Sequence, residues 1–164
     1  MGPASSGRIA TGGEPDRVQP APQEELVGTW TLVSCVGRWS DGRVMYRYGE
    51  SPRGMLIYDA GGNFSGQIFR QDRPHFESGN LLKGAPAEIK DAFEGYIAYY
   101  GTYEVDEAAG SLTHHVKGSL FPNWIGEDQT RLYEFSDGKL TLTTLPLVGK
   151  RAQLTLTLVW ERSG

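Results

Sequence analysis

The residues best suited to chemistry lie close together in residues 113–131. Polar, titratable and aromatic side chains gather there among apolar strand residues: His114, His115, Asn123, Trp124 and Arg131. A histidine titrates near neutral pH and can act as a general acid or base. An arginine can bind a carboxylate or stabilise an enolate through its planar guanidinium group. An apolar wall with a few placed hydrogen-bonding groups is what a ligand cavity needs, so this stretch predicts a small-molecule site.

The two adjacent histidines lie in a predicted strand over residues 111–119. Successive strand side chains point to opposite faces, so His114 shares a face with Leu112 and His115 shares a face with Lys117. Both histidines therefore cannot face one cavity, and the alternation alone leaves open which of them does. His115 is either a general base in the cavity or a solvent-facing residue. His114 is either a ligand contact or a buried histidine bonded to the backbone.

Neighbouring residues extend the candidate site. Asn123 and Trp124 lie in a predicted loop, where binding residues concentrate. Trp124 is either a wall of the pocket or a plug at one end of it, and Arg131 either contacts the ligand or stacks on a tryptophan. Tyrosine hydroxyls at strand positions are further candidates: Tyr99, Tyr103 and Tyr133. We predict that the three tyrosines, Asn123 and Trp124 contact the ligand, and the catalytic candidates are His115, His114 and Arg131.

The elements that must position these residues are strands. Turn residues such as Asp41-Gly42 and Asp137-Gly138 recur about every 8 to 12 positions between β-branched and aromatic segments, the spacing of an antiparallel barrel or sandwich. A sequential meander leaves open edges unless the sheet closes on itself. We therefore predict an all-β fold, an antiparallel up-and-down barrel of eight or nine strands, which can enclose one small ligand. The predicted strands are 26–37, 44–48, 55–59, 63–70, 97–106, 111–119, 130–135, 139–145 and 151–162.

One segment departs from the strand pattern. Between Gly84 and Tyr96 the apolar residues fall at helical spacing, and Pro86 suits a first helical position. This predicts a short amphipathic helix. Its apolar stripe must rest on the sheet or on an opening, and we expect it to cover one mouth of the barrel.

The composition limits the class of protein. The 164 residues suit one domain, and we expect a disordered tail over 1–24 and the barrel over 25–164. The net charge of -4, without a run of like charges, argues against a nucleic-acid partner. The chain starts without an apolar leader segment and has no run long enough to span a bilayer, so a cytoplasmic protein without a membrane partner is expected.

The residue spacing also argues against metals and cofactors. Adjacent strand histidines point apart, and no carboxylate has convincing ligand spacing, so we expect no metal site. The single cysteine, Cys35, lies mid-strand without an obvious base and is predicted to be a small core residue. Phosphate-binding glycine motifs are absent from the sequence, and we expect no cofactor. A haem-binding barrel, with one histidine projecting inward, is a third possibility for function.

Several segments together resemble a known family. The Gly28-Thr29-Trp30 start resembles the calycins, and residues 25–162 are similar to the bacterial and fungal lipocalin-like domain family. The matching segments are 28–30, 54–62, 99–103, 114–116, 121–126 and 140–143. The resemblance implies a small antiparallel barrel. It also implies that Arg162 is a possible counterpart of the arginine that packs on the motif tryptophan in secreted lipocalins, although the missing disulfide disfavours extracellular transport.

Family members divide between two functions. Some calycin-like barrels act as cofactor-free cyclases or isomerases in natural-product pathways, and others carry ligands. Our first hypothesis is a cyclase or isomerase acting on an apolar, oxygen-bearing, polyketide-like or terpenoid-like molecule. A histidine would transfer the proton, Arg131 and Asn123 would polarise an oxygen, and Trp124 with Tyr103 would shape the cavity. The alternative is a carrier that binds a small hydrophobic molecule without turnover.

Overall fold

The computed structural model describes residues 22–149 and 151–164. A short helix, α1 (Pro22–Leu26), leads into the first strand and buries Leu26 completely. Residues 22–24, assigned to the tail in the sequence analysis, belong to this helix. The rest of the predicted N-terminal tail, residues 1–21, lies outside the described part of the chain.

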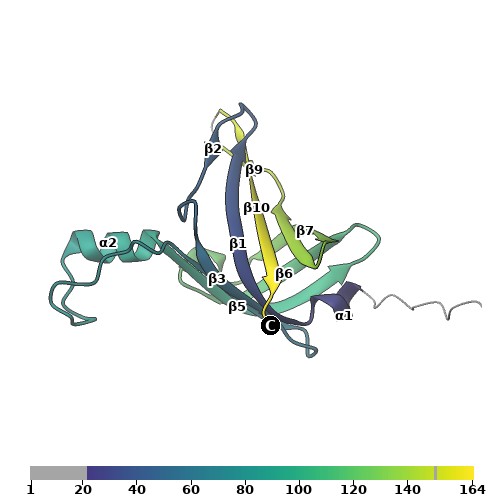
Figure 1. The fold of residues 1–164 in the computed structure, drawn as a ribbon, viewed down its shortest axis with the longest axis horizontal. Coiled ribbons are helices and arrows are strands. Elements are labelled where there is room, and N and C mark those ends of the chain that lie inside the picture. The colour runs from purple at the N-terminus through teal and green to yellow at the C-terminus, as the bar shows by residue number, and fades with distance from the viewer. Residues whose placement is uncertain (1–21, 150) are drawn as a thin grey trace, which may run out of the picture.

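Eight antiparallel strands form a closed barrel, which confirms the predicted fold class (Figure 1). The barrel closes because the first long strand pairs with the last, from Trp30 opposite Arg162 to Trp39 opposite Leu154. Two short strands, β2 (Val44–Met45) and β9 (Leu147–Val148), add to β1 and β10. The barrel strands, each paired with the next, are β1 (Gly28–Trp39), β3 (Arg53–Tyr58), β4 (Asn63–Phe69), β5 (Tyr96–Asp106), β6 (Ser111–Ser119), β7 (Asp128–Ser136), β8 (Lys139–Thr144) and β10 (Gln153–Arg162).

Tight turns join most of these strands as the sequence predicted. In the β7–β8 hairpin, Asp137 and Gly138 have φ angles of 52° and 72°. Two successive positive φ angles are what a type I′ hairpin turn requires, and aspartate followed by glycine tolerates them. The turn residues therefore set where the chain reverses.

The start of β1 is held against the end of β10. The Trp30 indole Nε1 donates a hydrogen bond to the Leu26 carbonyl at 2.8 Å. The Arg162 guanidinium lies 4.4 Å from the Trp30 ring centre and donates to the backbone carbonyls of Val27 and Glu25. The proposed pairing of Arg162 with Trp30 is confirmed.

Gly28 allows this packing, and replacing it is expected to destabilise the barrel. Its φ is 142°, which side-chain-bearing residues rarely adopt, and a Cβ there would overlap the Arg162 guanidinium. Gly28→Ala is expected to lower the free energy of unfolding by about 1–3 kcal/mol. Gly66→Ala is a matched control, because a Cβ there would make only ordinary contacts, the nearest at 3.4 Å from Leu56. Urea titrations measure both variants, and equal losses would contradict a special backbone requirement at Gly28.

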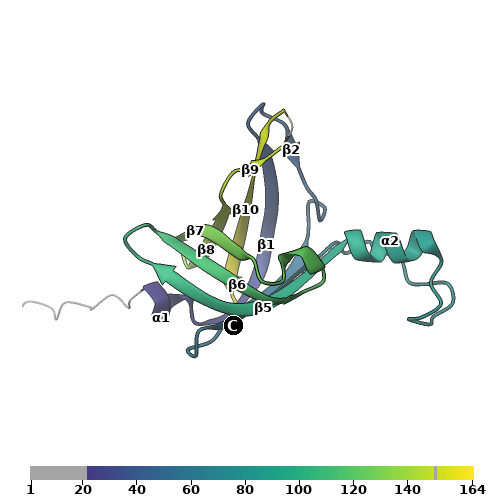
Figure 2. The ribbon, with the colours of Figure 1, turned by 180° about the vertical axis from the view of Figure 1, so that it is seen from behind.

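The predicted helix exists, but it does not cover a barrel mouth. α2 (Pro86–Glu94) begins at Pro86 as expected, and the Glu88 carboxylate accepts a hydrogen bond from the Ala85 N–H at 2.7 Å. Figures 1 and 2 show α2 projecting away from the barrel. Ile89 and Phe93 of its apolar stripe are 51% and 45% exposed. The prediction that this helix covers one mouth of the barrel is therefore wrong.

Polar contacts with the ends of β4 and β5 hold α2 in this position. Asp91 forms an ion pair of 2.7 Å with Arg70, which follows β4. The Arg73 guanidinium lies 5.2 Å and 4.8 Å from the ring centres of Phe69 and Tyr96, and its Nη1 donates to the Ala92 carbonyl of α2 at 3.5 Å. These contacts lie beyond the barrel wall, and they replace the apolar docking that the stripe suggested. Within residues 22–149 and 151–164, no helix has the length and apolar character needed to cross a membrane.

Candidate functional site

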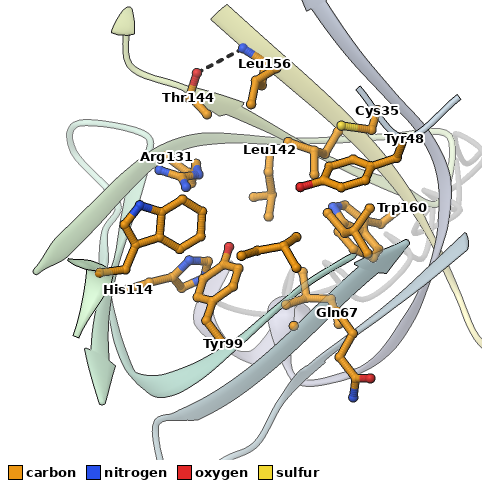
Figure 3. A pocket seen from close by; sticks show the side chains of 16 residues that line it. Cys35, Tyr48, Gln67, Tyr99, His114, Arg131, Leu142, Thr144, Leu156 and Trp160 are labelled. Atoms are coloured by element: carbon orange, nitrogen blue, oxygen red, sulfur yellow. Dashed lines mark hydrogen bonds between the residues drawn. The ribbon is translucent and has the colours of Figure 1, made fainter. Parts of the chain in front are cut away.

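A mainly apolar cavity opens inside the barrel, on the side where β1 and β8 end (Figure 3). Its enclosed free space is about 70 Å³, and the whole hollow including its open mouth is about 590 Å³. Aliphatic and aromatic side chains form most of the wall, and a few polar groups interrupt it. The lining residues that the site argument uses are Cys35, Tyr48, Tyr99, His114, Trp124, Arg131 and Trp160.

His114 is the most deeply placed polar group of the cavity. It projects inward from β6, is 1% exposed, and stacks on Phe64 with ring centres 4.1 Å apart. Its Nε2 lies 2.7 Å from the Tyr58 hydroxyl. Burial raises the pKa of Tyr58 well above its usual value, so the phenol keeps its proton. We infer that the hydroxyl donates to Nε2, because the described residues offer the Tyr58 proton no other acceptor.

This hydrogen bond determines the state of the other ring nitrogen. A neutral imidazole carries one proton, and with Nε2 accepting, the proton lies on Nδ1. Nδ1 is buried and has no hydrogen-bond partner among the described residues. Burial, together with the nearby positive charge of Arg131, lowers the pKa of His114 to about 3. His114 is therefore a neutral donor with a free N–H at neutral pH.

Arg131 supplies the positive charge beside His114. It comes from β7 and is partly buried, and Figure 3 shows its guanidinium on the same side of the cavity as His114 and Tyr99. Its Nη1 donates to the Thr130 carbonyl at 2.9 Å and its Nη2 to the Gln129 amide oxygen at 3.2 Å. Both acceptors are neutral, so the guanidinium charge is not compensated by either bond.

The opposite wall also presents donors. Trp160 of β10 is buried, and its Nε1 has no partner among the described residues. The Tyr48 hydroxyl points toward the middle of the cavity (Figure 3) and accepts a hydrogen bond from the Arg47 Nε at 3.3 Å. Cys35 is buried beside them, and burial raises the pKa of its thiol to about 11, which fits the predicted inert core residue.

An aromatic pair borders the His114 side. Trp124 belongs to the 3-10 turn η1 (Pro122–Trp124) and packs edge-on against Tyr99, with ring centres 5.2 Å apart. The Tyr99 ring is 5.9 Å from His114, and Figure 3 shows its hydroxyl pointing into the cavity. Four of the predicted site residues are thus brought together: His114, Arg131, Trp124 and Tyr99.

The structure places the other predicted residues elsewhere. His115 faces outward from β6, is 35% exposed, and lies 2.6 Å from the Asp128 carboxylate, which raises its pKa. Asn123 is exposed in η1, and Tyr133 is partly buried without lining the cavity. Tyr103 is buried in the core and donates to the Asp59 carbonyl at 3.0 Å. None of these four side chains lines the cavity.

Three residues of the site escaped the sequence analysis: Tyr58, Tyr48 and Trp160. Trp160 lies on the apolar face of the last strand and Tyr58 ends β3, whereas Tyr48 lies in a turn after β2, where the sequence predicted a strand over residues 44–48. Those strand patterns were visible signals, but no local pattern reports that Tyr58 meets His114, which is 56 residues away. The pairing across the barrel interior creates that contact.

The family model of the lipocalin-like domain matches residues 27–163 of the chain. The chain belongs to the lipocalin-like domain family. This lipocalin-like chain is 31% identical over 105 residues to the 4'-hydroxy-3'-methoxypropiophenone carrier protein ppsC of Aspergillus oryzae. The aligned region covers 60% of this chain and 95% of the relative.

Three solved structures show distant likenesses to the lipocalin-like barrel. A lipocalin-like protein from Bacteroides uniformis has 14% identity and a TM-score of 0.44, covering 85% of this chain and 99% of that one. A variant of the fluorescent protein UnaG has 17% identity and a TM-score of 0.39, and the REP1-NXSQ fatty acid transporter has 16% and 0.39. Each of these two alignments covers 86% of this chain and 98% of the chain of the solved structure.

Proposed function

We propose that the barrel binds and carries a small, apolar or aromatic molecule whose carbonyl or hydroxyl oxygen accepts a hydrogen bond from His114. The observation that carries this proposal is the buried Nδ1–H of His114, which has no partner among the described residues. A buried donor left unpaired costs about 1–3 kcal/mol. A ligand oxygen placed against Nδ1 removes that cost, so the cavity favours molecules with such an oxygen.

The relative supports the carrier function. Its name describes a carrier for an aromatic ketone, and that ketone combines an apolar ring with acceptor oxygens. The cavity offers matching surfaces, because Trp124 and Tyr99 present aromatic walls and His114 presents a donor. We therefore take aromatic ketones as the first ligand class to test.

A cyclase or isomerase remains the second candidate, favoured by the Tyr58–His114 hydrogen bond beside Arg131. A free N–H and a guanidinium could polarise a carbonyl and stabilise an enolate. With a pKa of about 3, however, His114 is a weak general base, since an effective base titrates near the working pH. The carrier function requires only the donor, and the geometry supports it better.

Binding of 4'-hydroxy-3'-methoxypropiophenone tests the carrier proposal. Trp124 and Trp160 line the cavity, so their fluorescence reports occupancy. We expect saturable binding that His114→Phe weakens about tenfold, the loss of one hydrogen bond in an apolar site. The double variant His114→Phe/Tyr58→Phe removes the hydroxyl that the single variant leaves unpaired.

His115→Phe is the matched control, because the neighbouring histidine faces outward and should leave binding unchanged. Absence of saturable binding by the unaltered protein would contradict the proposal. Equal affinity of the His114→Phe and unaltered proteins would remove His114 as the donor. Chromatography of the ligand after long incubation separates the two functions, because a carrier returns it unchanged and an enzyme converts it.

A further inference from the structure

The cavity contains a cation without a counter-ion. Arg131 bonds to two neutral oxygens, and among residues 22–149 and 151–164 no carboxylate lies within ion-pair distance of it. The described lining residues include no aspartate or glutamate. Charged side chains at partly buried, apolar sites are normally paired. The missing charge is therefore a property that a ligand can supply.

Unpaired donors on the two walls of the cavity strengthen the same preference. His114 Nδ1 and Trp160 Nε1 are buried donors without partners among the described residues. An anionic oxygen accepts several such bonds, and hydrogen bonds between charged partners are about twice as strong as neutral ones. A neutral carbonyl would satisfy His114 but would leave the guanidinium charge unpaired. An anion satisfies both at once.

We infer that the ligand is an organic acid, a phenol, enol or carboxylic acid on an apolar body, and that it binds as its anion with the charged oxygen against Arg131 and His114. This inference rests on the proposed function and specifies the chemical class of its ligand. On binding, the acid releases its proton to the solvent. Arg131 acts as the counter-cation and determines specificity for the ionised form.

The other titratable groups facing this part of the cavity leave the charge of Arg131 unopposed. They are Cys35 of β1, Tyr48 of the turn after β2, Tyr58 of β3, Tyr99 of β5 and His114 of β6, and the lining residues of β4, β8 and β10 add no titratable group. Burial raises the pKa of Cys35 to about 11 and raises the pKa of Tyr48 and Tyr58, so these groups are neutral near pH 7. His114 is neutral there because its pKa is lowered. On the outer face, Asp128 and Glu104 contact His115 instead.

Absorbance of 4-nitrophenol tests this inference, because its phenolate is yellow and its neutral form is not. We expect the bound probe to ionise about one pH unit or more below the free probe, the shift that a neighbouring arginine typically causes. Arg131→Met should abolish the shift and weaken phenolate binding by about tenfold or more. Arg131→Lys should keep the shift, because it keeps the charge.

Two controls isolate the charge. 4-Nitroanisole has the same ring but cannot ionise, so the unaltered and Arg131→Met proteins should bind it equally. Arg38→Met removes an exposed arginine of β1 and should change neither probe's binding. If both probes bind but the ionisation of bound nitrophenol is unshifted, the anionic ligand is excluded and the carrier proposal stands. If neither probe binds saturably, the proposed function itself fails. Should Arg131→Met not fold, the unaltered and Arg131→Lys proteins still decide.

Discussion

Acidification from above pH 7 to below pH 3 is expected to lower the free energy of unfolding by up to roughly 5 kcal/mol through His114 alone. Burial lowers the folded-state pKa of this histidine from 6.5 to about 3. The unfolded chain therefore binds a proton on His114 at a pH where the folded barrel does not. The contribution of His114 to stability is fully present above pH 6.5 and is lost as the pH falls toward 3. Below pH 3 this group causes no further change.

Urea titrations at a series of pH values measure this effect. His114→Gln offers the Tyr58 hydroxyl an amide oxygen without a titrating ring, and it should flatten the acid side of the stability profile. Asp41, Asp59 and Glu88 also have lowered pKa values and destabilise the fold in acid, but they do so equally in both proteins. An unchanged profile in His114→Gln would contradict the assignment.

The adjacent histidine supplies a control of opposite sign. The Asp128 hydrogen bond raises the pKa of His115, so its contribution is complete below pH 6.5 and is lost as the pH rises through the folded-state pKa. His115 is largely solvent-screened, and the effect of His115→Gln should be small. The two neighbouring substitutions are thus expected to move the stability profile in opposite directions.

Trp30→Ala is expected to lower the free energy of unfolding by about 3–5 kcal/mol, the range for removing a large buried aromatic side chain. The Trp30 ring is buried at the junction of β1 and β10 and lies 6.2 Å from the Phe135 ring. Its removal leaves a cavity, frees the Leu26 carbonyl and takes away the surface on which Arg162 stacks. Arg162 also ties the chain entry to the last strand, so barrel closure weakens.

Trp39→Ala provides the comparison within the same strand. Trp39 is only partly buried, and its ring meets the exposed Arg43 side chain with a separation of 4.9 Å. We expect this variant to lose about 1 kcal/mol, a typical value for a partly exposed side chain. Thermal and urea unfolding followed by far-UV circular dichroism compare the two. Similar losses would mean that Trp30 does not hold the barrel closed.

Local pattern was enough to predict the strands and the barrel. Period-two alternation and turn pairs such as Asp137-Gly138 depend on neighbouring residues, so they are legible without the fold. The pairing of Trp30 with Arg162 was foreseen from the family resemblance and is confirmed. His114, Trp124 and Arg131, which line one cavity in the structure, also stood out in the sequence, because chemistry-bearing residues cluster there in the chain.

The alternation within β6 separates His114 from His115 but does not say which face is inside. That choice was made when β6 paired with both neighbours and the sheet closed, which buried His114 against Tyr58 and left His115 with Asp128. The apolar stripe of α2 likewise suggested a docked helix, while the ion pair of Asp91 with Arg70 holds it away from the barrel. Contacts between residues far apart in the chain carry no local periodicity, and they depend on how the sheet curves and closes. Half of the predicted site residues therefore line the cavity, whereas its inner face and its hydrogen-bond partners follow from closure of the barrel.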